Sequence, residues 1–508
     1  MMSGTLIDTF NWWSVERADS PALVVGQEQL TYAQLRTWAQ TAAQWLVARG
    51  VEPGDRVGVM ATNSLQWVVL SQAAMLAGAI LAPVNPRFTF SEAFYLLGDR
   101  YQVKAVFHDD ERAEVVGKIV DQIPGAMLFS LAELNAHRRN TAVSELNTQA
   151  IGMDTELVII PTSGSTGRPK GVVLSHRSMS GYIADSCLAR PGAFSAPRTL
   201  LFAPLCTSAG YVVLTQYLAY GGTVFLEQAF DPEQALDKIV KQRISTMMGT
   251  PIFFERMAAC DSFRDADLSS LFYCLVGGAR VSRTLLDTWL NKGVLLRQLY
   301  GQTEVGGQAT FNTDQASIQY PEKCGRGSIY TRVGVIDAEG QFCPPGTPGQ
   351  IVIKGPGVMV RYWNDPEATA ATIVDGWVRT GDLGVLDEDG LLTMLDRIKD
   401  IIISGGLNIS AAEVERVISE YPGVHEVAVI AAHDDSFGET PLAIVNGLQP
   451  GDIPELLQHC CTHLSSYKVP RYMVCSSEPL PRVATGKIAK PVLREQYADA
   501  HLTLTKIR

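Results

Sequence analysis

Several features that would assign this sequence to other classes of protein are missing from it. It has no cluster of Lys and Arg, and its net charge is −11, so it lacks the cationic surface that a nucleic-acid-binding protein needs. None of its nine cysteines forms a CxxC pair, which argues against a zinc site or a disulfide framework. We therefore expect no nucleic-acid partner, and cysteines that pack as small buried apolar side chains in a reducing compartment.

Signals for export or membrane insertion are also missing. The first residues, MMSGTLIDTFNWW, lack a cationic start and a uniform apolar run, and Asp8 comes early. Residues 63–85 carry no charge and are about long enough to span a bilayer. Their polar side chains and the terminal Pro83 favour a buried helix followed by a strand. We expect no transmembrane segment and a cytoplasmic location.

The sequence does contain the apolar content and the alternating pattern of a layered α/β protein. Hydrophobic residues make up 46% of the 508 residues, and this length favours one large domain with at least one smaller one. Short apolar runs alternate with longer helical patterns such as residues 31–50, which predicts parallel sheet covered by helices. The runs are residues 56–60, 104–107, 157–160, 223–227 and 271–278.

The pattern changes beyond about residue 330. Short strands separated by turns, at residues 332–341, 344–355 and 384–395, predict antiparallel hairpins. Residues 411–424 then predict a helix, which is followed by strands and a helix that ends near Tyr467. We predict an α/β fold with a large N-terminal domain over residues 1–395, containing parallel sheets and a small barrel-like antiparallel portion. A smaller α+β domain follows over residues 396–508.

The strongest local pattern is Thr162-Ser163-Gly164-Ser165-Thr166-Gly167-Arg168-Pro169-Lys170-Gly171, which follows an apolar strand. Its glycines leave backbone N–H groups accessible, and its hydroxyls and lysine suit phosphate oxygens. The spacing differs from that of the Walker pattern. Considered alone, the segment fits a polyphosphate-binding loop and a Ser/Gly-rich surface turn about equally well.

Four more segments follow: Tyr300-Gly301-Gln302-Thr303-Glu304, Thr380-Gly381-Asp382, Asp396-Arg397-Ile398-Lys399-Asp400 and Pro481-Arg482-Val483-Ala484-Thr485-Gly486-Lys487-Ile488. Glu304 offers a carboxylate for magnesium, and Asp382 offers acceptors for ribose hydroxyls. Lys487 offers an ammonium group that neutralises carboxylate and phosphate oxygens. Together the five segments resemble the adenylate-forming superfamily of acyl-CoA synthetases, nonribosomal adenylation domains and firefly luciferases, from near residue 20 to near residue 490.

The resemblance implies a site for ATP and Mg²⁺. It puts Tyr300 against the adenine, Thr303 at the α-phosphate and Glu304 at the magnesium ion. It puts Asp382 and Arg397 at the ribose. The remaining nucleotide contacts that it implies are Thr162, Ser163, Gly164, Ser165, Thr166, Gly167, Lys170, Gly278, Ala279 and Gly301.

The resemblance also implies a mobile C-terminal domain with a hinge at Asp396. This domain presents Lys487 for the adenylation step. It then rotates to present Ser404, Gly405 and Gly406, along which the pantetheine arm of coenzyme A passes. A homodimer is compatible with the resemblance.

The acid pocket implied by the resemblance contains no Arg or Lys, so we predict an apolar fatty, alicyclic or aromatic monocarboxylic acid. One position departs from the family pattern, because Thr207 stands where many acyl-CoA synthetases have a histidine or an aromatic residue. The usual substrate gate is therefore not carried over to this chain. The pocket candidates are Thr207, Tyr211, Gly249, Gly277, Gln302, Gly306, Gly307 and Gln308.

We predict an ATP-dependent carboxylic acid:CoA ligase that forms acyl-AMP and pyrophosphate, and then acyl-CoA and AMP. The segment Cys206-Thr207-Ser208 lacks the aspartate of amino-acid adenylation domains, and only a short tail follows Lys487, which favours free coenzyme A as the acceptor. Three alternatives stay open: delivery to a separate carrier protein, a luciferase-type oxygenase, and a catalytically silent nucleotide-binding homologue.

Overall fold

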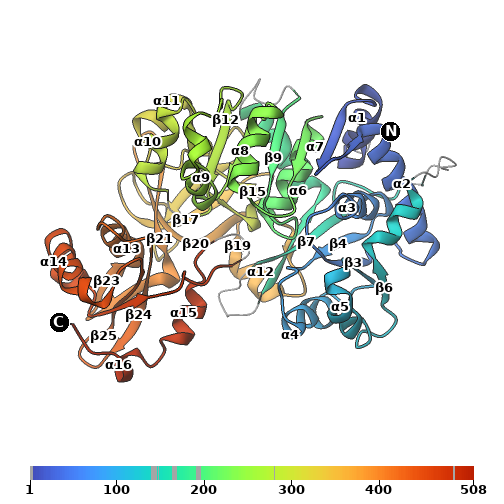
Figure 1. Ribbon diagram of the computed structural model, residues 1–508. Helices are drawn as coiled ribbons and strands as arrows, with labels where there is room; N and C mark the ends of the chain where they lie inside the picture. The colour runs from blue at the N-terminus through green and yellow to red at the C-terminus, as the bar shows by residue number, and fades with distance from the viewer. Residues whose placement is uncertain are drawn as a thin grey trace. The chain divides into compact units, whose positions relative to one another are not determined.

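The computed structural model describes residues 4–138, 146, 148–162, 169–189, 196–279, 281–483 and 487–507 (Figure 1). The chain divides into two compact units. The first consists of Met1–Val333 and Ile353–Arg379, and the second of Gly334–Val352 and Thr380–Arg508. The predicted domain boundary at residue 395 and the hinge at Asp396 stay predictions.

One sheet of the first unit contains five neighbouring parallel strands, followed at one edge by β8 and β18, each antiparallel to the strand before it; the order is β6-β5-β3-β4-β7-β8-β18. The apolar runs at 56–60, 104–107 and 157–160 all form strands here, as predicted. The strands are β3 (Arg56–Met60), β4 (Ile80–Pro83), β5 (Ala105–His108), β6 (Met127–Ser130), β7 (Glu156–Thr162), β8 (Lys170–Ser175) and β18 (Arg361–Tyr362).

A second sheet of the first unit has the order β13-β12-β11-β9-β10-β1-β2, and only β2 runs antiparallel to its neighbour. The strands are β1 (Pro21–Val25), β2 (Glu28–Thr31), β9 (Arg198–Leu201), β10 (Thr223–Leu226), β11 (Thr246–Gly249), β12 (Tyr273–Gly277) and β13 (Leu296–Leu299). Parallel strands joined through helices confirm the predicted α/β fold class.

The helices of the first unit begin where the sequence offers caps. Thr31 and Gln34 form a capping box at the start of α2 (Tyr32–Ala48), and Ser64 caps α3 (Leu65–Ala77). The other long helices are α1 (Leu6–Glu16), α5 (Ala113–Val120), α6 (His176–Ala189), α7 (Ser208–Ala219), α8 (Pro232–Lys241), α9 (Pro251–Ala258) and α10 (Arg283–Asn291).

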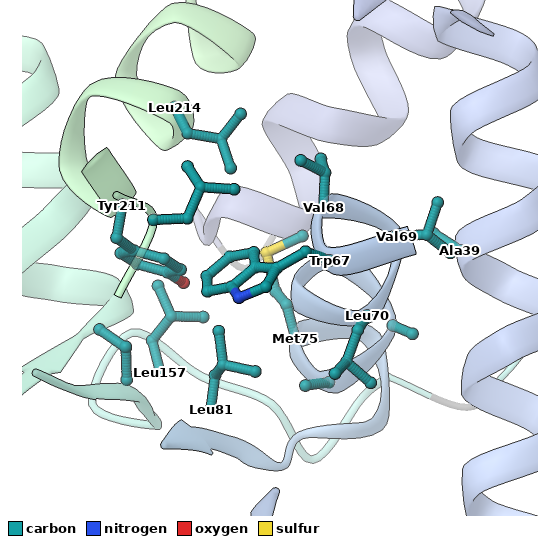
Figure 2. Packing of buried hydrophobic residues seen from close by; sticks show 14 of the residues in the cluster. Ala39, Trp67, Val68, Val69, Leu70, Met75, Leu81, Leu157, Tyr211 and Leu214 are labelled. Atoms are coloured by element: carbon teal, nitrogen blue, oxygen red, sulfur yellow. The ribbon is translucent and has the colours of Figure 1, made fainter. Parts of the chain in front are cut away.

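Helix α3 confirms that residues 63–85 form a buried helix followed by a strand, since it leads into β4. Nearly all of its side chains are buried. Figure 2 shows Trp67 beside Tyr211, with Met75, Leu81 and Leu157 around them; the two ring centroids are 6.4 Å apart. Within the described ranges, no helix is long and apolar enough to cross a membrane.

The second unit is built from antiparallel hairpins and a few helices. The unit boundaries fall inside the strands of a five-stranded sheet with the order β16-β17-β20-β19, in which β21 pairs with β20. These strands are β16 (Arg332–Ile336), β17 (Gly349–Lys354), β19 (Ile373–Val374), β20 (Trp377–Leu386) and β21 (Leu392–Arg397). The hairpin predicted at residues 384–395 is therefore confirmed.

A separate sheet of the second unit has the order β23-β22-β25-β24, with β26 parallel to β25. Its strands are β22 (Ile401–Ser404), β23 (Leu407–Ser410), β24 (Glu426–Asp434), β25 (Gly438–Asn446) and β26 (Tyr472–Ser476). The helices of this unit are α13 (Ala411–Ser419), α14 (Ile453–His463), α15 (Lys490–Gln496) and α16 (Ala500–Thr503). Helix α13 ends five residues earlier than the predicted 411–424 helix.

The cysteines follow the predicted pattern only in part. Cys206, Cys274, Cys324 and Cys460 are buried, as expected for small apolar side chains. The prediction is wrong for Cys187 and Cys461, which are exposed. Each of the two lies on a helix, α6 and α14 respectively, where burial of one face leaves other positions in solvent.

Candidate active site

Three neighbouring parallel strands bring predicted site residues to one edge of a sheet. Gly249 and Gly277 end β11 and β12, and Tyr300 follows β13. The register pairs Gly249 with Val276 and Gly277 with Leu299. Carboxyl ends of adjacent parallel strands form the usual ligand-binding edge of an α/β sheet. Gly278, with φ +78°, and Ala279 follow β12 and are exposed at this edge.

A small hairpin directly after Tyr300 carries the predicted catalytic pair. Strand β14 (Gly301–Gln302) pairs with β15 (Gly307–Gln308), and Thr303–Val305 form the turn between them. Gly306 completes the turn at φ +75°, a conformation that favours glycine. A Cβ atom at Gly301 would collide with the carbonyl oxygen of Gly307. Thr303 and Glu304 therefore project from the tip of a hairpin that tolerates little change.

The backbone of Tyr300 is held by hydrogen bonds, and its side chain is buried. Its backbone N–H donates to Thr310 Oγ1 at 2.8 Å, and its carbonyl oxygen accepts from the N–H of Ala309 at 2.9 Å. Only 7% of the residue is exposed. The remaining accessible part is what the predicted stacking on adenine would use.

Tyr362 is a site residue that the sequence analysis missed. Its hydroxyl donates to Glu304 Oε1 at 2.8 Å, and Lys170 Nζ lies 4.9 Å from the centroid of its ring. Burial, followed by the negative charge of Glu304, raises the pKa of Tyr362. The phenol therefore stays protonated and joins the predicted magnesium ligand to the lysine of the predicted phosphate loop.

The two ends of that phosphate loop are paired strands. Thr162 in β7 lies opposite Lys170 in β8, and Val172 of β8 lies opposite Tyr362 in β18. This ladder is what brings Lys170 and Tyr362 together. Ser163, Gly164, Ser165, Thr166 and Gly167, which were predicted to bind phosphate, lie outside the described residues.

Thr207 has a structural task that explains a hydroxyl at this position. It caps α7, where its Oγ1 accepts from the N–H of Gly210 at 3.2 Å and donates to the carbonyl oxygen of Pro204 at 2.7 Å. The next residue, Ser208, accepts a hydrogen bond from Thr303 Oγ1 at 2.9 Å between the two oxygens. The segment that replaces the family's histidine is thus tied directly to the predicted catalytic threonine.

The other predicted acid-pocket residues have mixed surroundings. Tyr211 is buried against Trp67 in the core (Figure 2). Gly249 faces aromatic rings, since an added Cβ would lie 3.2 Å from Phe202 and 3.4 Å from Phe253. Gly307 adopts φ +111° beside Val212. The side-chain nitrogen of Gln302 is buried and has no hydrogen-bond partner among the described residues, so a ligand could accept from it.

An aromatic cluster beside Gly249 was also missed by the sequence analysis. The ring centroids of Phe202 and Phe253 are 4.3 Å apart, those of Phe230 and Phe253 4.7 Å, and those of Phe202 and Phe230 5.0 Å. No local pattern indicates the cluster, because its rings come from three segments: Phe202 follows β9, Phe230 precedes α8 and Phe253 lies in α9.

In the second unit, the predicted ribose-binding pair is preformed. Asp382 and Arg397 are opposite each other on β20 and β21, and Arg397 Nε lies 3.6 Å from Asp382 Oδ1. The Asp382 N–H donates to Thr380 Oγ1 at 3.1 Å, and that hydroxyl donates to the carbonyl oxygen of Ile351 at 2.7 Å. The Thr-Gly-Asp segment of β20 is therefore anchored to β17.

Asp396, the predicted hinge residue, binds the start of α13. Its Oδ2 accepts from Ser410 Oγ at 2.7 Å and from the N–H of Ala412 at 2.9 Å, and its Oδ1 accepts from the N–H of Arg397 at 2.7 Å. The residue is 4% exposed. A carboxylate at a helix start is favourable for the helix, so Asp396 fixes the chain at the predicted pivot.

The predicted CoA segment is a two-residue hairpin turn. Ser404 pairs with Leu407 across β22 and β23, and Gly405 and Gly406 have φ values of +58° and +82°. Such turns need positive φ at both central residues. Gly405 also donates its N–H to the carbonyl oxygen of Phe437 at 2.8 Å, and an added Cβ would lie 2.9 Å from that ring.

The Lys487 loop closes on itself within the second unit. Val483 N–H donates to the carbonyl oxygen of Lys487 at 2.9 Å, and Ala489 N–H donates to that of Pro481 at 2.7 Å. Nζ of Lys490, just after this loop, lies 2.7 Å from Oε1 of the half-buried Glu415. Burial raises the pKa of Glu415, and Lys490 opposes that shift. Lys487 itself is half-buried, while residues 484–486 lie outside the described ranges.

Comparison with known proteins identifies the family of the chain. Residues 10–363 match the model of the AMP-binding enzyme family, and residues 413–487 match that of the AMP-binding enzyme C-terminal domain. A feruloyl-CoA synthase of Amycolatopsis is 36% identical over 495 residues, which cover 96% of this chain and 98% of the relative. The long-chain-fatty-acid–CoA ligase FadD13 of Mycobacterium tuberculosis is 34% identical over 475 residues, which cover 92% of this chain and 93% of the relative.

Solved structures show the same architecture. The o-succinylbenzoate coenzyme A synthetase MenE of Bacillus subtilis, in complex with ATP and magnesium ion, superimposes with a TM-score of 0.86 at 27% identity. The match covers 96% of this chain and 99% of that one. With both family models and full-length ligase relatives matched, the chain belongs to the AMP-binding enzyme family, in the AMP-forming acyl-CoA ligase branch of the adenylate-forming superfamily.

Proposed function

We propose that the protein joins an apolar or aromatic monocarboxylic acid to coenzyme A in two steps. In the first, a carboxylate oxygen of the acid attacks the α-phosphorus of ATP, the bond to pyrophosphate breaks, and acyl-AMP forms. In the second, the thiol sulfur of coenzyme A attacks the acyl carbon and AMP leaves. The observation that carries this proposal is that Tyr362 contacts both Glu304, through its hydroxyl, and Lys170, through its ring.

The residues around Glu304 fit a magnesium ion. Glu304 supplies a hard carboxylate oxygen, and Tyr362 orients that carboxylate by donating to one of its oxygens. Bound Mg²⁺ would neutralise charge on the phosphates. Thr303, fixed by its hydrogen bond to Ser208, is assigned to the α-phosphate, and Lys170 to the phosphate chain.

Residues of the second unit take the complementary roles. Asp382 accepts hydrogen bonds from the ribose hydroxyls, beside Arg397. Lys487 is assigned to the oxygens on which charge is redistributed during adenylation. The turn at Gly405 and Gly406 lets the pantetheine arm pass closely, because no side chain blocks it.

The aromatic cluster beside Gly249 supports an apolar or aromatic acyl group. Phe202, Phe230 and Phe253 present ring surface there, and none of the predicted pocket residues is Arg or Lys. A feruloyl-CoA synthase and a long-chain-fatty-acid–CoA ligase among the relatives fit the same range of acids. A cytoplasmic location is part of the same proposal, and light scattering would decide between a monomer and a homodimer.

The proposal is tested with a panel of fatty, aryl and alicyclic acids in the presence of ATP, Mg²⁺ and coenzyme A. Pyrophosphate release and the mass of the acyl-CoA product are measured for each acid. Both products with one class of acid are expected. Pyrophosphate without thioester would direct the search to a carrier protein, light emission would favour an oxygenase, and no product with any acid would favour a silent homologue.

A further inference from the structure

A narrow cavity lies inside the first unit, with room for about one water molecule. Polar and apolar side chains both contribute to its lining. The polar ones include Ser186 of α6, Gln216 of α7, Tyr273 of β12 and Gln308 of β15, next to the apolar Met248 and Leu275. All of these residues belong to the first unit.

The cavity lies along the strands that carry the predicted acid pocket. Tyr273, Leu275 and Gly277 alternate along β12 and therefore share one face of the sheet. Met248 of β11 lies opposite Leu275 in the register and so shares that face, and Gln308 of β15 is itself a predicted pocket residue. At about 3.3 Å per residue, the stretch from Gly277 to Leu275 and Tyr273 runs roughly 7 to 13 Å inward from the carboxyl end of the strand. The cavity therefore shares Gln308 with the predicted pocket and lies on the same face of β12 as Gly277.

Ser186 is the polar group in this cavity that lacks a partner. It is 1% exposed, and its Oγ has no hydrogen-bond partner among the described residues. Burial raises the pKa of the nearby Tyr182 to about 12, and Ser186 opposes that shift, but the two hydroxyls do not reach hydrogen-bonding geometry. A buried hydroxyl without a partner is costly, so a ligand that completes it is favoured.

The side-chain nitrogens of the two glutamines in the lining donate hydrogen bonds to other residues. Gln216 Nε2 donates to the hydroxyl of Tyr220 at 2.9 Å, and Gln308 Nε2 donates to the carbonyl oxygen of Thr310 at 2.7 Å. Each side chain keeps its carbonyl oxygen, which only accepts. Acceptors together with a serine hydroxyl suit a ligand group that both donates and accepts.

We propose that this cavity receives a hydroxyl group carried by the acid at the end remote from its carboxylate, and that Ser186 is the specificity-determining residue that hydrogen-bonds to it. This inference rests on the proposed ligase function and narrows its substrate class. A hydroxyl group has the size of the space and replaces a single water there. The distance along β12 fits an acid with one ring and a short spacer.

The test compares 3-(4-hydroxyphenyl)propanoic acid with 3-phenylpropanoic acid in the full ligase assay, as the ratio of their kcat/KM values. The wild-type enzyme is expected to prefer the hydroxylated acid by about tenfold, since one hydrogen bond to an otherwise unpaired buried group is satisfied. Ser186→Ala is expected to bring the ratio to within about twofold of unity, while activity on the unsubstituted acid is kept. That retained activity shows that the variant folds.

Ser180→Ala provides a matched control. Ser180 lies on the same helix and its hydroxyl also has no partner among the described residues, but it does not line the cavity. The control should keep the wild-type ratio. An unchanged ratio in Ser186→Ala, or no preference in the wild-type enzyme, would overturn the inference and leave the ligase function standing. No product with any acid would overturn both.

Discussion

The predicted catalytic groups of the two units are held in different ways. In the first unit, Thr303 and Glu304 sit on a hairpin that begins directly after β13, with backbone packing so close that Gly301 has no room for a side chain. In the second, Lys487 lies in a surface loop closed by two backbone hydrogen bonds and an ion pair between Lys490 and Glu415. The first arrangement suits fixed binding of a nucleotide, and the second suits a group delivered for one step.

Among the substitutions that test this difference between the two units, the largest loss of activity is expected at Lys487. Lys487→Ala should lower the rate of pyrophosphate release by about 100- to 1000-fold, because an electrostatic stabiliser of the adenylation step is removed. Thioester formation from supplied acyl-AMP should change little. Lys468→Ala, which removes another cation of the same unit, is the control. Equal losses in both half-reactions would contradict a role confined to adenylation.

A stability effect of similar size is expected in the first unit from His176. This residue is fully buried and accepts from the N–H of Leu6 through Nδ1 at 3.3 Å, and burial lowers its pKa from 6.5 to about 4. In the unfolded chain the His176 side chain takes up a proton near pH 6.5, whereas in the folded chain it does so only near pH 4. The stabilising contribution is therefore complete above pH 6.5 and is lost as the pH falls towards 4, by about 3 kcal/mol.

Chemical denaturation between pH 4 and 7 measures this loss against His176→Gln, whose side chain does not titrate. The difference in the free energy of unfolding between the two proteins should shrink as the pH falls. A difference that stays constant over this range would show that His176 titrates alike in both states.

A smaller effect is expected where Tyr362 supports Glu304. Tyr362→Phe keeps the ring beside Lys170 but removes the hydroxyl that orients the carboxylate. The adenylation rate should fall about tenfold, and more Mg²⁺ should be needed for half-maximal rate. Tyr421→Phe is a matched control, because its hydroxyl donates to Glu455 at 3.0 Å in the second unit. If both variants needed the same Mg²⁺ concentration for half-maximal rate, Tyr362 would have no role in binding the metal.

The smallest expected effect is at Thr207. Thr207→Ala removes the cap of α7 and should lower the free energy of unfolding by about 1 kcal/mol. Thr207→Ser keeps the hydroxyl and should restore it. Because the hydroxyl of Thr207 is committed to the helix start, KM for the acid should stay within about twofold of the wild type. A large change in KM for the acid without loss of stability would instead show that Thr207 controls substrate binding at the acid pocket.

Much of the fold could be predicted because the relevant signals are local. The run RVGVM is apolar, short and followed by a helical pattern, and it forms β3. Residues 384–395 form a hairpin around an Asp-Gly turn, as their composition predicts. Helix α13 was predicted too long, because the pattern of residues 420–424 could not show that its last residues turn away towards β24.

The site was predictable to the extent that it follows the chain. Tyr300, Thr303 and Glu304 lie within one short segment of the chain, so their grouping was visible before the structure. Tyr362 was not, because 58 residues separate it from Glu304 and the two-residue strand β18 has no distinctive sequence pattern. The pairing of β18 with β8 is what brings Tyr362 to Lys170.

The residues alone were sufficient for the fold class, the family and the order of the nucleotide-binding segments, since each depends on a few neighbouring positions. The lining of the cavity in the first unit was decided only in three dimensions. Ser186, Gln216, Tyr273 and Gln308 come from four separate elements, and their meeting depends on how strands and helices pack. Burial then fixes their chemistry, because a hydroxyl that is ordinary in solvent becomes a selective partner once water is excluded.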